Sequence, residues 1–160
     1  MTKQITPYRF IALAMVYIAM LPAPTMAQTL NCPQPLVYGD YSVTCGGTAT
    51  IIVRPDGTRN VSGCASADAA PFTNGLCTVS QSFPFQTIQV SAPASATITH
   101  TGGSPSMTLD NFNLVTNNGG NTYLTSSPFT NVPIGAQLNM PASPTNGTYN
   151  GTITITAVFQ

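Results

Sequence analysis

Glutamate is absent from this chain, and charge of either sign is scarce. Lysine and arginine together number 4 and aspartate 4 among 160 residues, so that charged residues make up 5% of the sequence. A chain without a basic face lacks the electrostatic surface of a nucleic-acid-binding protein. Helices usually carry lysine and glutamate on their solvent side, so the composition favours strands and turns.

Histidine is nearly absent as well, with His100 as its one occurrence. A hydrolase triad needs a base beside its nucleophile, and the sequence has no Gly-x-Ser-x-Gly elbow to supply one. A glycosidase pair of carboxylates is not evident, in keeping with the missing glutamate. We therefore expect His100 to be a surface or turn residue and the protein to be neither an enzyme nor dependent on a cofactor.

Metal sites are poorly supported. The four cysteines contain no Cys-x-x-Cys pair and lie far from His100, which disfavours zinc. The oxygen-rich run Asp110-Asn-Phe-Asn113 offers ligands suited to calcium, but without the spacing of an EF-hand loop. A β-bulge capped by Asp110 and Asn111 is the preferred interpretation of this run.

The first 27 residues have the organisation of a secretory signal peptide. Lys3 and Arg9 precede an apolar run from Phe10 to Leu21, and the sequence Thr25-Met-Ala27 resembles a cleavage site. Cleavage there leaves residues 28–160 as a single domain that begins at Gln28 and carries a net charge of about −2. No second apolar run is long enough to span a membrane, so we expect an exported chain without a membrane span.

The cysteines of the remaining chain are even in number and follow a signal peptide, which predicts disulfide bonds. They are Cys32, Cys45, Cys64 and Cys77. Four cysteines allow three pairings. The equal spacing within the first two and within the last two favours two local bridges, Cys32–Cys45 and Cys64–Cys77.

Short alternating segments separated by turn signals predict an all-β protein, a sandwich or barrel of antiparallel strands. Leu36 to Val43 gives a first short strand after a proline-containing lead-in, and Pro55-Asp-Gly57 is a hairpin turn. Cys64 to Cys77 is expected to be mostly loop, and Ile134-Gly135 is expected to turn. The other predicted strands are residues 48–54, 58–61, 76–90 in two pieces broken by Pro84, 95–100, 106–115, 123–129 and 136–140.

The last predicted strand has the clearest pattern. After a glycine-rich turn, Ile153, Ile155, Ala157 and Phe159 alternate with three threonines and a valine. A period of two with β-branched residues indicates a strand with one buried face. We expect Ile153, Ile155 and Phe159 to enter the core.

This ending carries a resemblance. Together with Ser106–Phe112 and Ile134–Asn139, the run from Gly147 through Tyr149 to Ile155 resembles the bacterial domain-of-unknown-function family 4402. That family is similar to spore-coat-U-like proteins and to chaperone–usher pilus subunits. The resemblance implies a single immunoglobulin-like sandwich at a bacterial surface or in the periplasm.

Pilus subunits of that type end in an alternating strand with an earlier glycine and a penultimate aromatic residue, the places that Gly147 and Phe159 occupy. The resemblance implies strand addition by a periplasmic chaperone or by like subunits as partners. Residues 28–31, which precede Cys32, are too short to serve as a donor strand. The first hypothesis is thus a non-enzymatic, pilin-like or surface-associated module that acts by β-strand pairing.

The alternative is a monomeric secreted adhesin or carbohydrate-binding module that uses its loops. Tyr123 and Tyr149 would stack on sugars, and the asparagines of residues 117–121 would hydrogen-bond to them.

Overall fold

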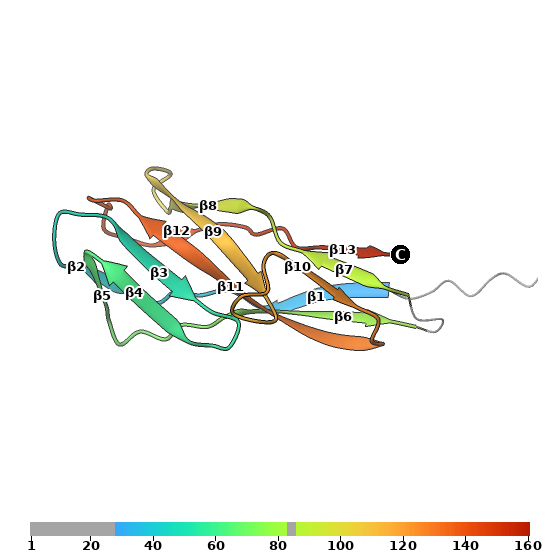
Figure 1. The fold of residues 1–160 in the computed structure, drawn as a ribbon. Coiled ribbons are helices and arrows are strands. Elements are labelled where there is room, and N and C mark those ends of the chain that lie inside the picture. Colours follow the sequence, from blue (N-terminus) through green and yellow to red (C-terminus); the bar gives the residue numbers. More distant parts are fainter. Residues whose placement is uncertain (1–27, 83–85) are drawn as a thin grey trace, which may run out of the picture.

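The computed structural model describes residues 28–82 and 86–160, and its regular secondary structure is entirely β-strand (Figure 1). The predicted signal peptide, residues 1–27, lies outside the described residues. None of the described residues forms a helix long and apolar enough to cross a membrane. The strands are β1 (Gln28–Gln34), β2 (Tyr41–Val43), β3 (Ala49–Val53), β4 (Arg59–Gly63), β5 (Ala65–Ala67), β6 (Gly75–Gln81), β7 (Ile88–Ser91), β8 (Ser95–His100), β9 (Ser106–Leu114), β10 (Thr122–Thr125), β11 (Phe129–Met140), β12 (Tyr149–Asn150) and β13 (Thr156–Phe159).

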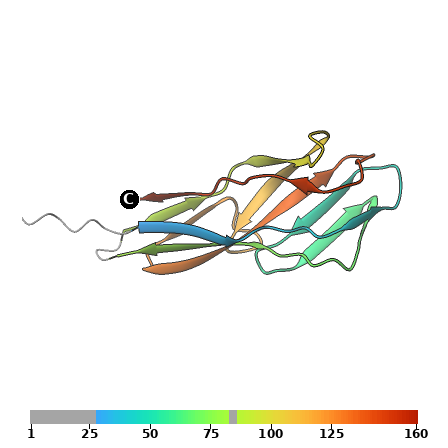
Figure 2. The same ribbon diagram turned by 180° about the vertical axis from the view of Figure 1, so that it is seen from behind.

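The strands form an antiparallel sandwich. The larger sheet has the order β1-β6-β11-β9-β8-β12, with β3 and β4 added along β11, and the smaller sheet has the order β10-β7-β13. A two-stranded ribbon of β2 and β5 completes the fold. The two ribbon views show the elongated shape that follows from strands lying nearly parallel to one axis (Figures 1 and 2). The predicted all-β class is confirmed.

The core lies between the sheets and is built by alternation. β3 and β6 bury every second residue, as β7 does with Ile88 and Val90, which are both fully buried. Alternate side chains of a strand point to opposite faces, so one face of each strand enters the core and the other stays wetter. The buried apolar residues are Ala49, Ile51, Val53, Cys77, Val79, Ile88, Val90, Ala92, Met107, Leu109, Phe112, Leu114, Val132, Ile134, Ala136, Leu138 and Met140.

β11 is the central strand and differs most from expectation. It runs from Phe129 to Met140 through Pro133 and Gly135, where the sequence predicted a turn, and it pairs with β3, β6 and β9. Gly135 is needed because a Cβ there would lie 2.5 Å from the carbonyl oxygen of Val53. The expected turn at Ile134-Gly135 is therefore wrong: the glycine permits close strand packing, not chain reversal.

The expected bulge in β9 is confirmed. Gly135 of β11 faces Asn113, whereas Gln137 faces Asp110, so two residues of β9 oppose the single residue Ala136. Asn111 takes φ 48°, a left-handed conformation that asparagine tolerates better than most residues. This extra residue shifts the alternation of β9 and so restores Phe112 to the core.

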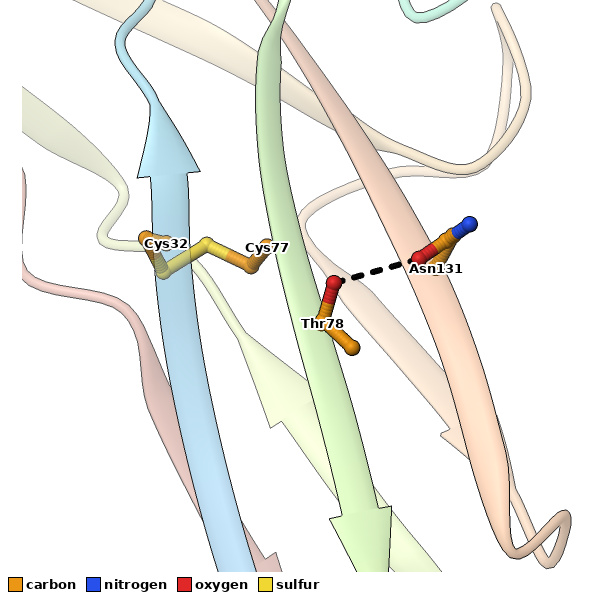
Figure 3. The surroundings of a disulfide bond; sticks show 4 residues. All are labelled: Cys32, Cys77, Thr78 and Asn131. Carbon is orange, nitrogen blue, oxygen red and sulfur yellow. Dashed lines mark hydrogen bonds between the residues drawn. A yellow bond between two sulfur atoms is a disulfide. The ribbon is translucent and has the colours of Figure 1, made fainter.

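The predicted disulfide pairing is wrong. The bridges are Cys32–Cys77 and Cys45–Cys64, with Cα atoms 3.9 and 5.0 Å apart. β1 pairs with β6 so that Asn31 faces Thr78, and this register brings Cys32 beside Cys77 (Figure 3). Equal spacing in the sequence carried no information because long-range strand pairing decides which cysteines meet.

The N-terminal region also differs from the predicted strands. The stretch before Leu36 forms β1, whereas the predicted strand over Leu36–Val43 is reduced to β2 and an isolated bridge between Val37 and Thr73. The expected loop between Cys64 and Cys77 holds the short β5 and the start of β6. Residues 28–31, considered as a donor segment, are already paired within their own sandwich.

The hairpin turn at Pro55-Asp-Gly57 forms as predicted. Gly57 takes φ 79°, and the Oδ1 atom of Asp56 accepts hydrogen bonds from the backbone N–H and the hydroxyl of Thr58. The Oδ2 atom accepts a 2.6 Å bond from the side chain of Asn117, which ties this turn to the loop after β9. These bonds, with that from Asn117 the strongest influence, lower the pKa of Asp56 from 3.8 to about 2.

The lowered pKa of Asp56 predicts a pH dependence. A carboxyl with a depressed pKa in the folded state contributes stability above its unfolded pKa, and this contribution is lost as pH falls from about 4 through about 2. The melting temperature of the wild type should therefore fall more over this range than that of Asp56→Asn. Thermal melts at a series of pH values test this expectation, and parallel curves for the two proteins would contradict it. The effect should be small because Asp56 is fully exposed.

Candidate functional site

The C-terminal strand of the sandwich is only partly paired. β12 pairs with β8, ending with Asn150 opposite Thr99, and β13 pairs with β7, starting with Thr156 opposite Ser91. Six residue steps separate Asn150 from Thr156, whereas eight separate their partners, so the two ladders are out of step. Within the described chain, residues 151–155 consequently have no ladder partner on either side.

Side chains along this strand alternate as the sequence predicted. Ile153, Ile155 and Phe159 pack against the buried core, while the threonines and Val158 between them are exposed. The inward face is thus correctly assigned. These three side chains are half-buried, however, whereas Ile88 and Val90 on the neighbouring β7 are fully buried. The core is less completely covered along this strand than along β7.

The backbone of β13 leaves hydrogen-bonding groups free on its outer side. The N–H of Gln160 donates to the carbonyl oxygen of Thr87 on the β7 side, at 2.8 Å. Backbone groups of successive strand residues point to opposite sides, so Ala157 and Phe159 direct their N–H and C=O away from β7. β13 ends the order β10-β7-β13, and no other described strand pairs with it. We call the outer side of residues 151–159 the C-terminal edge.

Comparison with a complete immunoglobulin sandwich shows what this edge lacks. By chain order, β1-β6-β11-β9 corresponds to strands A-B-E-D of such a sandwich, and β7 and β13 correspond to C and F. The second sheet of the complete fold has the order C-F-G. The place of strand G, beside F, is therefore the C-terminal edge.

β1 lies on the same side of the molecule. In the view from behind, β1 and the C-terminal strand both run along the near side (Figure 2). The side-chain amide of Gln28 donates a 2.9 Å hydrogen bond to Gln86, the residue before the Thr87 that binds Gln160. Leu30, half-buried, packs against the same core. Among the described strands β1 pairs only with β6, so two sheet edges border this side.

The C-terminal edge carries none of the usual protection of edge strands. Natural edge strands are commonly shielded by lysines, other charges, prolines or bulges. Between Gly147 and Gln160 the sequence contains no charged residue and no proline. By contrast, β1 contains Pro33, and β4, at another edge, begins with Arg59. The C-terminal edge is thus open to pairing with another strand.

Gly147 and Tyr149 serve to anchor the start of this strand on His100. The ring of Tyr149 meets that of His100 edge-on, with centroids 5.3 Å apart, and its hydroxyl donates to the carbonyl of Thr145. The Nδ1 atom of His100 accepts from the N–H of Gly102, and Nε2 lies 3.2 Å from the carbonyl oxygen of Asn146. Gly147 takes φ 141°, and a Cβ there would collide with the imidazole. His100 therefore acts as a turn residue, as expected.

The residues considered for calcium lie in and next to the bulge of β9. The Oδ2 atom of Asp110 accepts a 2.8 Å bond from Asn139, and Asn113 caps the loop by binding the carbonyl of Asn111 and the N–H of Gly120. In residues 28–82 and 86–160 no three His, Cys, Asp or Glu side chains gather as metal ligands would. These polar side chains stabilise the bulge and its loop.

The tyrosines considered for sugar stacking lie on different sheets. Tyr123 of β10 faces Val90 in the smaller sheet, whereas Tyr149 of β12 faces His100 in the larger sheet. Two of the three loop asparagines are also engaged: Asn117 binds Asp56, and Asn121 donates to the carbonyl of Ala92. The structure does not bring these residues together.

The structure thus groups the sequence-predicted residues in three places. Ile153, Ile155 and Phe159 share the inward face of the C-terminal edge, and Gly147 and Tyr149 lie at its anchored start. The cysteines lie elsewhere: Cys32 and Cys77 in β1 and β6, and Cys45 and Cys64 outside the strands. The neighbouring β1 was not predicted from the sequence. Its signal was the pair Thr29–Leu30 ahead of Cys32, too short a pattern to identify a strand.

Comparison with known proteins gives one match. The model of the family described as "Domain of unknown function (DUF4402)" matches residues 28–159. No curated protein and no solved structure matches the chain significantly.

Proposed function

The chain belongs to the DUF4402 family, and we propose that it is an exported, non-enzymatic, pilin-like or surface-associated module that acts through β-strand pairing at its C-terminal edge. The observation that carries this proposal is the terminal strand itself. It stands where a complete immunoglobulin sandwich has strand F beside strand G, and its outer backbone groups are free. An added strand would supply both the missing hydrogen bonds and cover for the half-buried inward face.

Export fits the chemistry of the chain. Two disulfides are formed among four cysteines, and such bonds persist in oxidising compartments such as the periplasm or the cell exterior. A non-enzymatic role of the protein also fits the surroundings of His100, because both of its ring nitrogens face backbone groups of nearby turns. The partner in this proposal is a periplasmic chaperone or a like subunit that contributes an extended strand.

The adhesin alternative receives no comparable support. Its two tyrosines lie on different sheets, and Tyr149 is engaged with His100 and Thr145. The free backbone N–H and C=O groups of the C-terminal edge distinguish the two hypotheses. Strand addition requires such groups, whereas a sugar site built from loop side chains does not.

Strand addition can be tested with a synthetic peptide. The probe is an uncharged ten-residue peptide with valine and threonine alternating, followed by a short lysine tag for solubility. We expect its addition to shift the backbone amide resonances of residues 151–159 and to protect the N–H groups of Ala157 and Phe159 from hydrogen exchange. A control peptide with proline at every second position lacks the required donors and should change neither. Binding that leaves residues 151–159 unperturbed, or no binding, would overturn the proposal.

A further inference from the structure

We propose that the C-terminal edge pairs with the same edge of a second copy of this chain, so that two three-stranded sheets join into one six-stranded antiparallel sheet. This inference rests on the proposed strand pairing and names its partner. The second copy's β13 would take the place of strand G beside strand F, and the two copies would be related by a twofold axis across the new pair.

The backbone supplies a self-complementary ladder. Ala157 and Phe159 direct their N–H and C=O outward, and Ile155, two residues earlier, follows the same alternation. A twofold axis at Ala157 places that residue opposite its own copy and places Ile155 opposite Phe159 of the second copy. Each of these residue pairs exchanges two hydrogen bonds in an antiparallel ladder, and none of the bonds competes with those to β7.

The side chains in this register are compatible. On the inner face, Ile155 meets Phe159 of the second copy, and both are half-buried and uncharged. On the outer face, Thr156 meets Val158, which is 50% exposed in the single chain. Aromatic and β-branched residues placed opposite each other stabilise antiparallel pairs, and no like charges meet. Pairing therefore covers the apolar side chains that the single chain leaves most open along this strand.

Charge favours a second copy as the occupant. The described chain has two arginines and four aspartates, and none of them lies between Gly147 and Gln160. Edges with side-chain charges of a single sign would repel their own copies when paired antiparallel, whereas this edge carries no charged side chain. A partner that binds through charged side chains would find no oppositely charged side chain on this edge. Two of the other edges differ, because Pro33 removes a backbone donor from β1 and β4 begins with Arg59.

Two substitutions test this arrangement in the oxidised, exported chain. Ala157→Pro removes an N–H that points to the open edge and serves no bond within the single chain, a position where edge strands tolerate proline. Val158→Lys places a charge on the exposed outer face beside the twofold axis. Thr152→Lys is the matched control, because Thr152 is also exposed but lies outside the ladder of Ile155–Phe159.

Sedimentation equilibrium over a range of protein concentrations gives the readout. We expect a concentration-dependent dimer for the wild type and for Thr152→Lys, and a dimer dissociation constant raised at least about tenfold in each of the two edge variants. Circular dichroism at low concentration should show the same fold in all four proteins. If Ala157→Pro fails to fold, Val158→Lys decides the question alone.

A wild type that remains monomeric at every concentration would overturn the inference, as would a dimer whose dissociation constant is unchanged in Val158→Lys. These failures are distinguishable from failure of the proposed function. If the valine–threonine peptide adds to residues 151–159 while the chain alone stays monomeric, strand pairing stands and the second copy is the wrong partner. If the peptide leaves residues 151–159 unperturbed and the chain is monomeric, both are wrong.

Discussion

Removing the disulfide between β1 and β6, by replacing Cys32 and Cys77 together with alanine, is expected to lower the free energy of unfolding by about 4 kcal/mol. The bond joins two cysteines with a sequence separation of 45. It lowers the conformational entropy of the unfolded chain, and this stabilising effect grows with the length of the closed loop. Cys77 is 1% exposed, so alanine there also loses some packing in the core. Denaturant unfolding of the purified variant measures the change.

The second disulfide provides the control. Cys45–Cys64 has a separation of 19, for which the same model gives about 3 kcal/mol. Both cysteines lie outside the buried core, so the paired alanine variant should be the more stable of the two. A domain of this size has about 5–15 kcal/mol of stability, so the loss of either bond should be readily measurable. A larger loss from the Cys45 and Cys64 variant would show that loop length and core packing are not the deciding terms.

Placing a carboxylate on the inward face of the terminal strand is expected to be almost as damaging. Ile155→Asp loses part of the apolar burial of a half-buried isoleucine and brings a charge against the core, together about 2–4 kcal/mol. The yield of soluble protein should fall, and the melting temperature should drop by several degrees or more.

The neighbouring residue gives the matched comparison. Thr154 is exposed on the opposite face, so Thr154→Asp should change the free energy of unfolding by less than about 0.5 kcal/mol. Both variants should be measured at low protein concentration, where self-association contributes nothing to stability. Similar losses from the two substitutions would show that the strand faces the core differently from the arrangement described above.

Local sequence signals were sufficient wherever a strand's environment is set by its own pattern. The alternation of Ile153, Ile155 and Phe159 identified the inward face, and Asp110-Asn111 identified the bulge in β9. The turn at Asp56 was equally readable, because Pro, Asp and Gly each favour its backbone conformation directly. In each case the deciding interactions span only a few residues.

Long-range pairing was not readable from the same signals. The register of β1 on β6 decides the disulfides, and nothing near Cys32 specifies that Cys77 will be its neighbour. The full length of β11 was not predicted because Pro133 and Gly135 normally interrupt strands. Here the β9 ladder starts only at Ile134, and Gly135 allows close approach to Val53, so neither residue interrupts the strand.

The partial pairing of the C-terminal strand was also beyond local reasoning. The sequence predicts a continuous strand up to Phe159, but Pro93 lies in the facing stretch between β7 and β8 and offers no N–H. The facing stretch also contains two more residues over the same interval, so the ladders on either side are out of step. A gap of this kind depends on two segments separated by more than fifty residues.

The disulfide between Cys32 and Cys77 also makes the domain mechanically asymmetric. If the chain is pulled from its two ends, tension on β1 meets a covalent bond at Cys32, and the segment up to Cys77 cannot lengthen. Tension on the C-terminal strand meets only the two-residue ladder of β12 and the four-residue ladder of β13. The C-terminal strand should therefore detach from the sandwich first under load. If subunits were linked through this strand, the β12 and β13 ladders would separate before the segment between Cys32 and Cys77 unfolds.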